Sequence, residues 1–142
     1  MRFPAFILIL GLLVGCASNG ARPHAIWHPE VFSMIQCWLS DTASPVVTEV
    51  NLDAIQRDRN QFDQAAIKQE DGWIVYREAR GSFKRYRVIE HNGNHYQVEY
   101  QENGGGTLTT VSQIEFSIGK RVIHVNGQPT VINILRVISY TR

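Results

Sequence analysis

The sequence lacks the marks of several large classes of protein. It carries almost no net charge, with 14 Lys and Arg against 13 Asp and Glu. This balance argues against general affinity for nucleic acid, because that affinity needs a basic surface. The N-terminal apolar run, residues 5–14, is too short for a transmembrane helix, which needs about 20 residues. The glycine run 104–106 is not followed by Lys and Ser or Thr, so it does not form a phosphate-binding loop.

Cysteine is scarce, since only Cys16 and Cys37 occur. Cys16 ends the apolar run in the tetrapeptide Leu-Val-Gly-Cys at 13–16, and Arg2 supplies a positive charge before the run. This pattern resembles the signal peptide and lipobox of bacterial lipoproteins. The resemblance implies that residues 1–15 are cleaved and that Cys16 carries a diacylglycerol and usually a third acyl chain, such as palmitate. An ordinary secretory signal that is cut elsewhere is the alternative.

The residue after the lipidated cysteine sorts lipoproteins of this kind. An aspartate there retains them in the inner membrane, whereas this chain has Ala17. The resemblance therefore implies a lipid anchor in the outer membrane, facing the periplasm, with exposure on the cell surface still open. Two acyl chains already suffice for stable anchoring. Residues 16–28, which contain Ser18, Gly20 and Pro23, predict a short lipidated tether, and residues 29–142 predict one globular domain.

The remaining cysteine has no partner in the chain once Cys16 is lipidated. Cys37 is then either buried as a small hydrophobic residue beside Ile35 and Trp38 or paired with another molecule. Cleavage also removes Arg2, which leaves 13 basic and 13 acidic residues. We therefore expect a neutral domain with no internal disulfide.

Helical spacing occurs in two segments before residue 70. Pro29 is followed by apolar residues at 31, 35, 38 and 39, which predicts a short helix. Alternation predicts a strand over 46–52. Asp53, as an N-cap, then begins a pattern that predicts an amphipathic helix over 53–69, ended by the Asp-Gly pair at 71–72.

From Trp73 onward the pattern is that of strands and turns. Two registers compete around the turn at 92–94, and a three-residue loop is favoured because it matches apolar with apolar and basic with acidic side chains. The pairs that this register predicts are Tyr86–Tyr100, Arg87–Glu99, Val88–Val98 and His91–His95.

The last third of the chain predicts further hairpins. A strand over 107–118 turns Leu108, Ile114, Phe116 and Ile118 inward. A turn at Gly119-Lys120 places Glu115 opposite His124, and Asn126-Gly127 marks the last reversal. The final strand, 130–140, is apolar on both faces, so we expect both faces to be covered.

The predicted fold class is therefore α+β. We expect an antiparallel meander of about five or six strands with one N-terminal amphipathic helix packed on it. A small closed β-barrel is the alternative.

Three groups of side chains are candidates for a site. His91 and His95, with Glu90, have ligand types suited to zinc or copper, or else flank an exposed turn. Glu115 with His124 resembles a general-base pair, although no nucleophile motif accompanies it and a cross-strand ion pair explains it equally. A basic cluster could bind a partner or an anionic surface, or could form an ordinary solvated sheet face. Its members are Arg77, Arg80, Lys84, Arg85 and Arg87.

These features favour a non-enzymatic binding or accessory protein for a periplasmic or outer-membrane partner, with no cofactor and no nucleic acid. Two alternatives stay open. One is a carrier of a small apolar ligand held in a curled sheet. The other is a metal-assisted enzyme that uses His91 and His95.

Overall fold

The computed structural model describes residues 26–36, 47–57 and 66–142, and it shows an open antiparallel sheet of seven strands in the order β1-β7-β6-β5-β4-β3-β2. The strands are β1 (Glu49–Asn51), β2 (Ile67–Glu70), β3 (Trp73–Arg77), β4 (Phe83–Asn92), β5 (His95–Asn103), β6 (Thr110–Val125) and β7 (Gln128–Thr141). The predicted antiparallel meander is confirmed for β3 to β7. Strand β1 falls within the strand predicted over 46–52 and pairs with β7, whereas β2 was not predicted as a strand. The barrel alternative is wrong, because β1 and β2 lie at opposite ends of the sheet.

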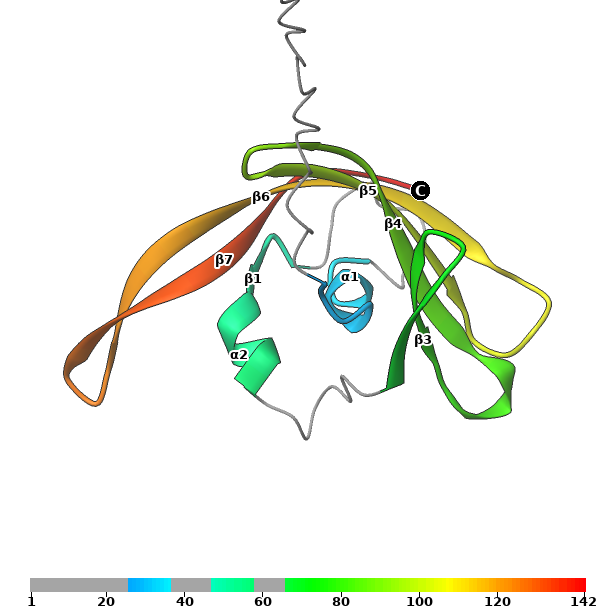
Figure 1. Cartoon of the computed structure of the whole chain (residues 1–142), viewed down its shortest axis with the longest axis horizontal. Helices are drawn as coiled ribbons and strands as arrows, with labels where there is room; N and C mark the ends of the chain where they lie inside the picture. The colour runs from blue at the N-terminus through cyan, green and yellow to red at the C-terminus, as the bar shows by residue number, and fades with distance from the viewer. Residues whose placement is uncertain (1–25, 37–46, 58–65) are drawn as a thin grey trace, which may run out of the picture.

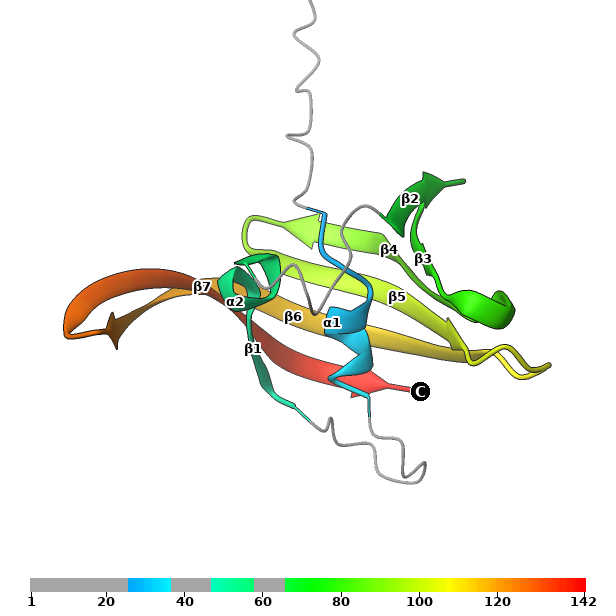
Figure 2. The same cartoon turned by 90° about the horizontal axis from the view of Figure 1, so that it is seen from below.

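The sheet arches over two short helices (Figure 1). These helices are α1 (Glu30–Ser33) and α2 (Leu52–Arg57), and the face that they lie against is called the concave face here. Seen from below, α1 crosses the middle strands and α2 lies beside β1 and β7 (Figure 2). No helix among the described residues has the length and apolarity needed to cross a membrane.

The core lies between α1 and the concave face. Alternation along the strands turns Tyr86, Tyr100 and Phe116 toward the helix, where all three are buried. The ring of Phe32 on α1 lies 4.7 Å from that of Tyr86, 5.8 Å from that of Tyr100 and 5.7 Å from that of Phe116. The short helix predicted after Pro29 therefore forms, although its predicted members at 38 and 39 lie outside the described residues.

The folded part begins earlier than the expected tether boundary after residue 28. Trp27 and His28 are both buried. The backbone N–H of Trp27 donates a hydrogen bond of 2.9 Å to the Tyr86 hydroxyl, and its indole packs edge-on against Phe116. The physical reason is that a large aromatic side chain beside an apolar sheet gains more from burial than from exposure in a linker.

The helix predicted over 53–69 is wrong at its C-terminal end, because Ile67–Glu70 is strand β2. Helix α2 spans Leu52–Arg57, and residues 58–65 of the predicted helix lie outside the described residues. Asp71 and Gly72 both have positive φ, 48° and 80°, which is the two-residue hairpin turn that Asp-Gly favours. The sequence pair that was expected to stop a helix thus joins β2 to β3.

The cap of α2 also differs from the prediction. The Asn51 side-chain oxygen accepts a hydrogen bond of 3.0 Å from the Ala54 N–H, so Asn51 is the capping residue. Asp53 instead accepts hydrogen bonds from the backbone N–H and side-chain amide of Asn133 on β7. The strand predicted over 46–52 is correspondingly short, because the helix begins at Leu52.

The β4–β5 hairpin confirms the predicted register only in its inner part. Tyr86–Tyr100, Arg87–Glu99 and Val88–Val98 are cross-strand pairs as predicted. A bulge at Ile89 then shifts the register, so that the loop has two residues and His91 faces Tyr96. The prediction that His91 pairs with His95 is wrong for this reason.

The β6–β7 hairpin is longer than predicted. Strand β6 continues through Gly119 to Val125, and the chain reverses only at Asn126-Gly127, where φ is 52° and 77°. The predicted reversal at Asn126-Gly127 is confirmed, and the turn at Gly119-Lys120 is wrong. One long ladder keeps more cross-strand pairs than two short hairpins would.

The apolar side chains of β6 and β7 differ in how deeply they are buried. Ile132, Ile134 and Leu135 are buried, but Val131 and Ile138 are more than half exposed, so the expectation that both faces of the final strand are covered holds only for part of it. The expectation that Leu108 points inward is wrong, since this side chain is 76 % exposed.

Candidate binding surface

The basic cluster predicted on β3 and β4 is divided between the two faces of the sheet. Lys84 lies on the concave side, where its side chain is only 14 % exposed. Its ammonium group pairs with Glu30, with Glu78 at 3.1 Å and with Glu102 at 3.9 Å. Because neighbouring residues of a strand point to opposite faces, Arg85 and Arg87 cannot join it.

Arg85 and Arg87 lie on the opposite, convex face, over the ring of Trp73. Their guanidinium carbons are 4.4 Å and 4.8 Å from the ring centroid. Arg85 donates hydrogen bonds to the side-chain oxygen of Gln101, and Arg87 donates to the Glu99 carboxylate. These contacts occupy both cations within the sheet, so they do not form an open anionic-ligand site.

The other two members of the cluster are also separate. Arg77 pairs with Glu70 on β2. Arg80 has φ of 65° in the short 3-10 turn Ala79–Gly81 and is exposed. The structure thus does not bring the five predicted basic residues together.

The lysine on the concave side stands in a strongly acidic environment. Burial raises the pKa of the Glu30 carboxyl, and the Lys84 ammonium only partly offsets this effect. Glu102 is itself buried and accepts hydrogen bonds from Gln36 at 2.9 Å and from the Tyr100 hydroxyl at 3.1 Å. Burial and the neighbouring Glu102 charge both raise the pKa of Tyr100. This network links α1 to the sheet. Its charged groups pair with one another, so they do not form an open site for a ligand.

The histidines of the β4–β5 hairpin lie on opposite faces. The imidazole of His91 contacts the Tyr96 ring and Nε2 lies 2.7 Å from the Gly93 carbonyl oxygen. The Nε2 atom of His95 lies 2.9 Å from Glu115 Oε1. Within the described parts of the chain, no group of three or more His, Cys, Asp or Glu side chains is placed to hold a metal ion.

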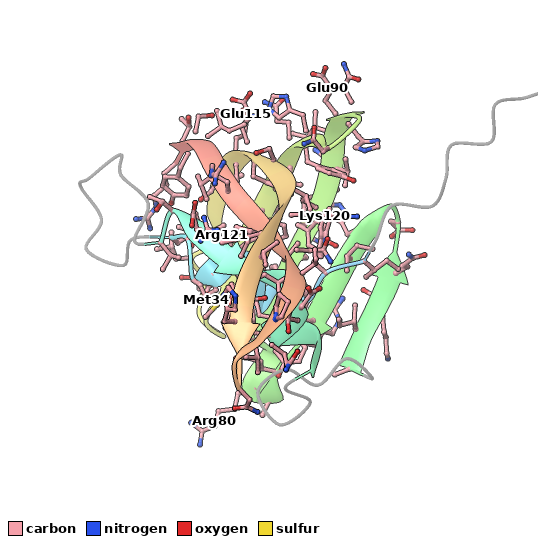
Figure 3. The ribbon with its side chains drawn as sticks, turned by 90° about the vertical axis from the view of Figure 1, so that its left-hand side faces the viewer. Met34, Arg80, Glu90, Glu115, Lys120 and Arg121 are labelled. Carbon is pink, nitrogen blue, oxygen red and sulfur yellow. The ribbon has the colours of Figure 1, made fainter. Side chains whose placement is uncertain are left out.

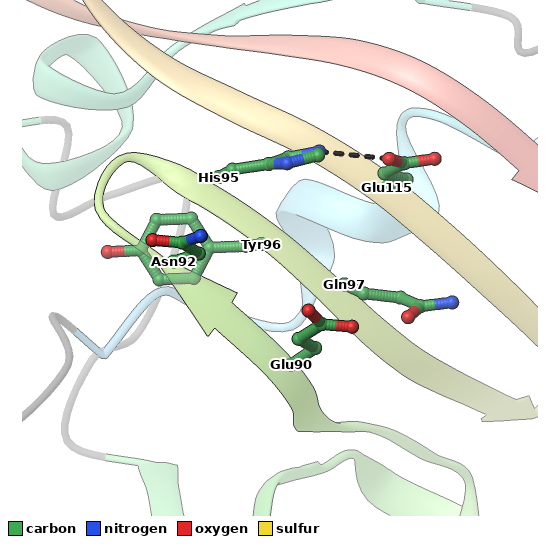
Figure 4. A pocket seen from close by; sticks show the side chains of 6 residues that line it. All are labelled: Glu90, Asn92, His95, Tyr96, Gln97 and Glu115. Atoms are coloured by element: carbon green, nitrogen blue, oxygen red, sulfur yellow. Dashed lines mark ion pairs between the residues drawn. The ribbon is translucent and has the colours of Figure 1, made fainter.

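A small polar pocket surrounds the His95–Glu115 pair. It has a volume of about 150 Å³, and Figure 4 shows the imidazole and the carboxylate pointing toward each other from neighbouring strands. Its lining residues are Glu90, Asn92, His95, Tyr96, Gln97 and Glu115.

The geometry of this pair is not that of a nucleophile activated by a base. Ser139 donates a hydrogen bond of 2.8 Å to Glu115 and not to His95, whereas an activated serine must contact the imidazole. The predicted partner of Glu115 is elsewhere, because His124 lies opposite Pro129 near the end of β6. The Glu115–His124 prediction is therefore wrong, and the His95–Glu115 pair is an exposed ion pair.

A larger pocket lies on the concave side, at the end of the sheet where the β4–β5 turn approaches α2. Its volume is about 320 Å³. Trp27, Leu52 and Ile118 give it an apolar wall, while Asp53 and Asn133, which bond to each other, lie at its polar side. Its lining is thus mixed, with an apolar wall and a polar side.

The sheet continues beyond its seven-stranded body as a two-stranded extension of β6 and β7. Strand β5 pairs with β6 only as far as Ser117, and β1 pairs with β7 only over residues 134–136. Residues 119–133 continue beyond both neighbours as a twisted hairpin that projects from the arch (Figure 1). We call residues 119–133 the distal ribbon.

The distal ribbon exposes apolar side chains in register. Val122 and Val131 are direct cross-strand partners, and each is 59 % exposed. Val125, next to the turn, is 43 % exposed. Two-stranded hairpins are marginally stable without a covering layer, so the exposed valine pair makes this hairpin a candidate binding surface.

The ribbon also carries charge of one sign. From residue 116 to the C-terminus the chain has no Asp or Glu, but it contains Lys120, Arg121, Arg136 and Arg142. Figure 3 shows Lys120 and Arg121 on opposite sides of the ribbon. This surface was not predicted from the sequence, because a turn was expected at Gly119-Lys120, in the middle of β6. The signal that could have identified it is the stretch after Glu115, which lacks Asp and Glu and contains Val122, Val125 and Val131.

Cys16, the predicted site of lipidation, and Cys37 lie outside the described residues. Comparisons of the chain with protein-family models, with curated proteins and with solved structures find no match.

Proposed function

We propose that the chain is a lipoprotein of the outer membrane, anchored through Cys16, whose domain faces the periplasm and binds a protein partner without catalysis. The lipobox-like sequence at 13–16 supports the anchor. In this proposal the domain is an α+β unit, in which the N-terminal helical segment packs on the sheet and so fixes the side from which the tether leaves. Surface exposure of the domain is compatible with the same anchor.

The observation that carries the binding role is the cross-strand pair Val122–Val131 on the distal ribbon. Both side chains are more than half exposed, and they lie on a hairpin that has no neighbouring strand among the described residues. A partner that covers this pair would remove apolar surface from water, which is favourable at about 25 cal/mol per Å². The tip of the ribbon lies apart from both helices (Figure 1), whereas its base contacts α2 through Asn133 and Asp53, so a partner can reach Val122 without unfolding the core.

The test places a photo-crosslinking amino acid at single positions of the full chain in intact cells. We expect a discrete crosslinked product from position 122, on the ribbon. The matched control is position 113, an exposed residue of the same strand within the seven-stranded body, which should give no such product. Equal yields from both positions, or no product from either, would contradict the proposal.

The anchor is tested separately. The Cys16→Ala variant should leave the membrane fraction, and mass spectrometry of the wild-type protein should find acyl chains on Cys16. A bare thiol at this position, or a retained leader, would remove the lipoprotein assignment while leaving the ribbon experiment interpretable.

A second candidate function, a carrier of a small apolar ligand, is favoured by the pocket of about 320 Å³ beside Trp27. Native mass spectrometry of the protein extracted from its membrane would show a bound small molecule, and Ile118→Trp, which would fill the pocket, should remove it. Absence of any bound mass in the wild type would argue against a carrier.

A further inference from the structure

We propose that the outer edge of β6, from Gly119 to Val125, accepts an acidic segment of the partner as an added β-strand. This inference rests on the proposed function and specifies its partner chemistry. Strand addition uses main-chain hydrogen bonds for affinity and side-chain alternation for specificity. The structure supplies both in this segment.

The backbone groups that face outward can be assigned from one pair of contacts. The Ile118 N–H donates to the Asn94 carbonyl oxygen at 2.8 Å, and the Asn94 side-chain amide donates to the Ile118 carbonyl oxygen at 3.1 Å. Both backbone groups of Ile118 therefore point to the β5 side. Because these directions alternate along a strand and β6 is regular from 118 to 125, the backbone groups of Lys120, Val122 and His124 point outward. Within the described parts of the chain no strand pairs with these groups, so they form an edge that an added strand could join in either direction.

The other edge of the ribbon is much less available. On β7 the outward positions are Pro129, Val131 and Asn133. Pro129 has no N–H to donate, and the Asn133 N–H already donates to Asp53 at 2.8 Å. Edge strands are commonly protected by proline or by a covering segment. Between 119 and 125 strand β6 contains no proline, and no segment among residues 26–36, 47–57 and 66–142 pairs with its outer edge, so the addition is assigned to β6.

The positive charge around the β6 edge indicates that the added strand is acidic. Among the described residues, no carboxylate lies within ion-pair distance of Lys120. Arg121 and Arg136 share the single carboxylate of Glu49, at 2.7 Å and 3.0 Å. Around the edge, cations thus outnumber anions, and an acidic strand complements them.

The same charges disfavour a second copy of this chain as the occupant. Two β6 edges paired antiparallel about Val122 would place each Lys120 opposite His124 of the other copy, so neither lysine would gain a carboxylate partner, whereas an acidic strand supplies one. Lysine on a strand edge is a known device against such self-pairing.

Side-chain alternation defines the partner further. Lys120, Val122 and His124 lie on one face of β6, with Val131 beside Val122. An added strand therefore needs an apolar residue opposite Val122 and an acidic residue two positions away, opposite Lys120. Because the strand can run in either direction, this acidic residue lies on either side of the apolar one, and a peptide with one on each side fits both directions. The expected motif is acidic-x-apolar-x-acidic, where x faces the other side of the ribbon.

The test uses the lipidated full chain in zwitterionic detergent micelles and a synthetic peptide with the core Glu-Thr-Val-Thr-Glu. A peptide with Lys in place of both Glu residues is the control ligand. Titration calorimetry measures binding, and amide hydrogen exchange reports which N–H groups the peptide protects. We expect the acidic peptide to protect the amides of Lys120, Val122 and His124, and the basic peptide to bind about tenfold more weakly or not at all.

Two variants of the same residue separate backbone from side-chain contributions. Val122→Pro removes an outward N–H, a change that an edge strand tolerates, together with the isopropyl group, and should weaken binding of the acidic peptide by about tenfold or more. Val122→Thr keeps the N–H and the branched shape and should bind nearly as the wild type does. Unchanged amide exchange along 126–141 establishes that the Val122→Pro ribbon is folded. If that exchange is lost, Val122 backbone N-methylation by protein semisynthesis provides the same deletion of the donor.

The outcomes distinguish this inference from the proposed function. If Val122→Pro binds the acidic peptide as the wild type does, or if both peptides bind equally, strand addition is overturned. Photo-crosslinking to a partner from position 122 would still stand in that case. Binding to phosphatidylglycerol vesicles that the peptide does not displace and that Val122→Pro does not alter would assign the ribbon to a lipid surface, and would also overturn the inference.

Discussion

Gln36 and Glu102, which are 66 residues apart in the sequence, are joined by a buried hydrogen bond of 2.9 Å from the Gln36 amide to the Glu102 carboxylate. The bond fastens the end of the α1 segment to β5. Ser112 on β6 donates to the same Gln36 side chain at 3.1 Å, so three segments meet at one amide.

Loss of this amide should cost substantial stability. We expect Gln36→Leu, which keeps the size of the side chain, to lower the free energy of unfolding by about 1–3 kcal/mol, because buried polar groups of Glu102 and Ser112 lose a partner. Urea denaturation measures the change. Met34→Leu, at a neighbouring position that is 40 % exposed, should stay within about 0.5 kcal/mol of the wild type. Equal stability of the two variants would contradict the role of the bond.

The beginning of the folded domain at Trp27 gives a second prediction. Trp27 is 3 % exposed, whereas its neighbour Ile26 is 44 % exposed. Trp27→Ala should destabilise the protein by about 3–5 kcal/mol, and Ile26→Ala should change stability by no more than about 0.5 kcal/mol. Thermal unfolding of the two variants compares them directly. Similar melting temperatures would place residue 27 in the tether, as the sequence first indicated.

The glycine run 104–106 gives a third prediction, because only its middle residue is constrained. Gly105 has φ of +90°, and a Cβ there would lie 3.1 Å from the Arg80 carbonyl oxygen. At Gly106 a Cβ would meet nothing within 4 Å, and φ is not in the left-handed region. We expect Gly105→Ala to cost about 1–2 kcal/mol or more, and Gly106→Ala to be neutral or slightly stabilising. If chemical denaturation finds both substitutions neutral, the run is only a flexible connection.

Matching of cross-strand side chains predicted the strand register correctly where the paired residues lie close together in the sequence. The inner β4–β5 register followed from Arg87 facing Glu99 and Val88 facing Val98. The bulge at Ile89 could not be predicted in this way, because each register is acceptable near the turn. Because the bulge shifts the register by one residue, His95 lies on the face opposite His91, and the predicted pairing of His91 with His95 does not form.

The other errors in the predicted secondary structure arose where pairing between strands distant in the sequence selects one of two locally acceptable structures. Asp71-Gly72 is compatible with a helix stop or with a hairpin, and only the partner strand β3 selects the hairpin. Gly119-Lys120 is compatible with a turn, but pairing with β7 over the whole length of β6 is selected instead. The distal ribbon, which carries the candidate binding surface, therefore could not be predicted without knowing that β6 pairs with β7 along its whole length. The basic cluster was predicted by its composition, yet strand alternation and neighbouring carboxylates divide it.

The ion pairs of Glu49 lead to a prediction about pH. Hydrogen bonds from Arg121 and then from Arg136 hold the pKa of the Glu49 carboxyl below its ordinary value. Since the folded-state pKa is the lower one, the pairs add stability above the unfolded-state pKa of about 4.3, and this contribution is lost as the pH falls through the folded-state pKa.

Glu49→Gln should therefore lower the urea midpoint at pH 7, and the difference from the wild type should shrink as the pH falls below about 4. The difference should also shrink in about 1 M NaCl, because exposed charges are screened. Glu90→Gln removes an exposed carboxylate that has no ion-pair partner among the described residues, so its urea midpoint should follow the wild type at every pH.

Because Glu49 lies on β1 and its two partners lie on β6 and β7, Glu49→Gln should also speed amide exchange in residues 119–133 more than in β4 and β5. A uniform increase across the sheet would mean that Glu49 supports the whole domain and not the base of the ribbon.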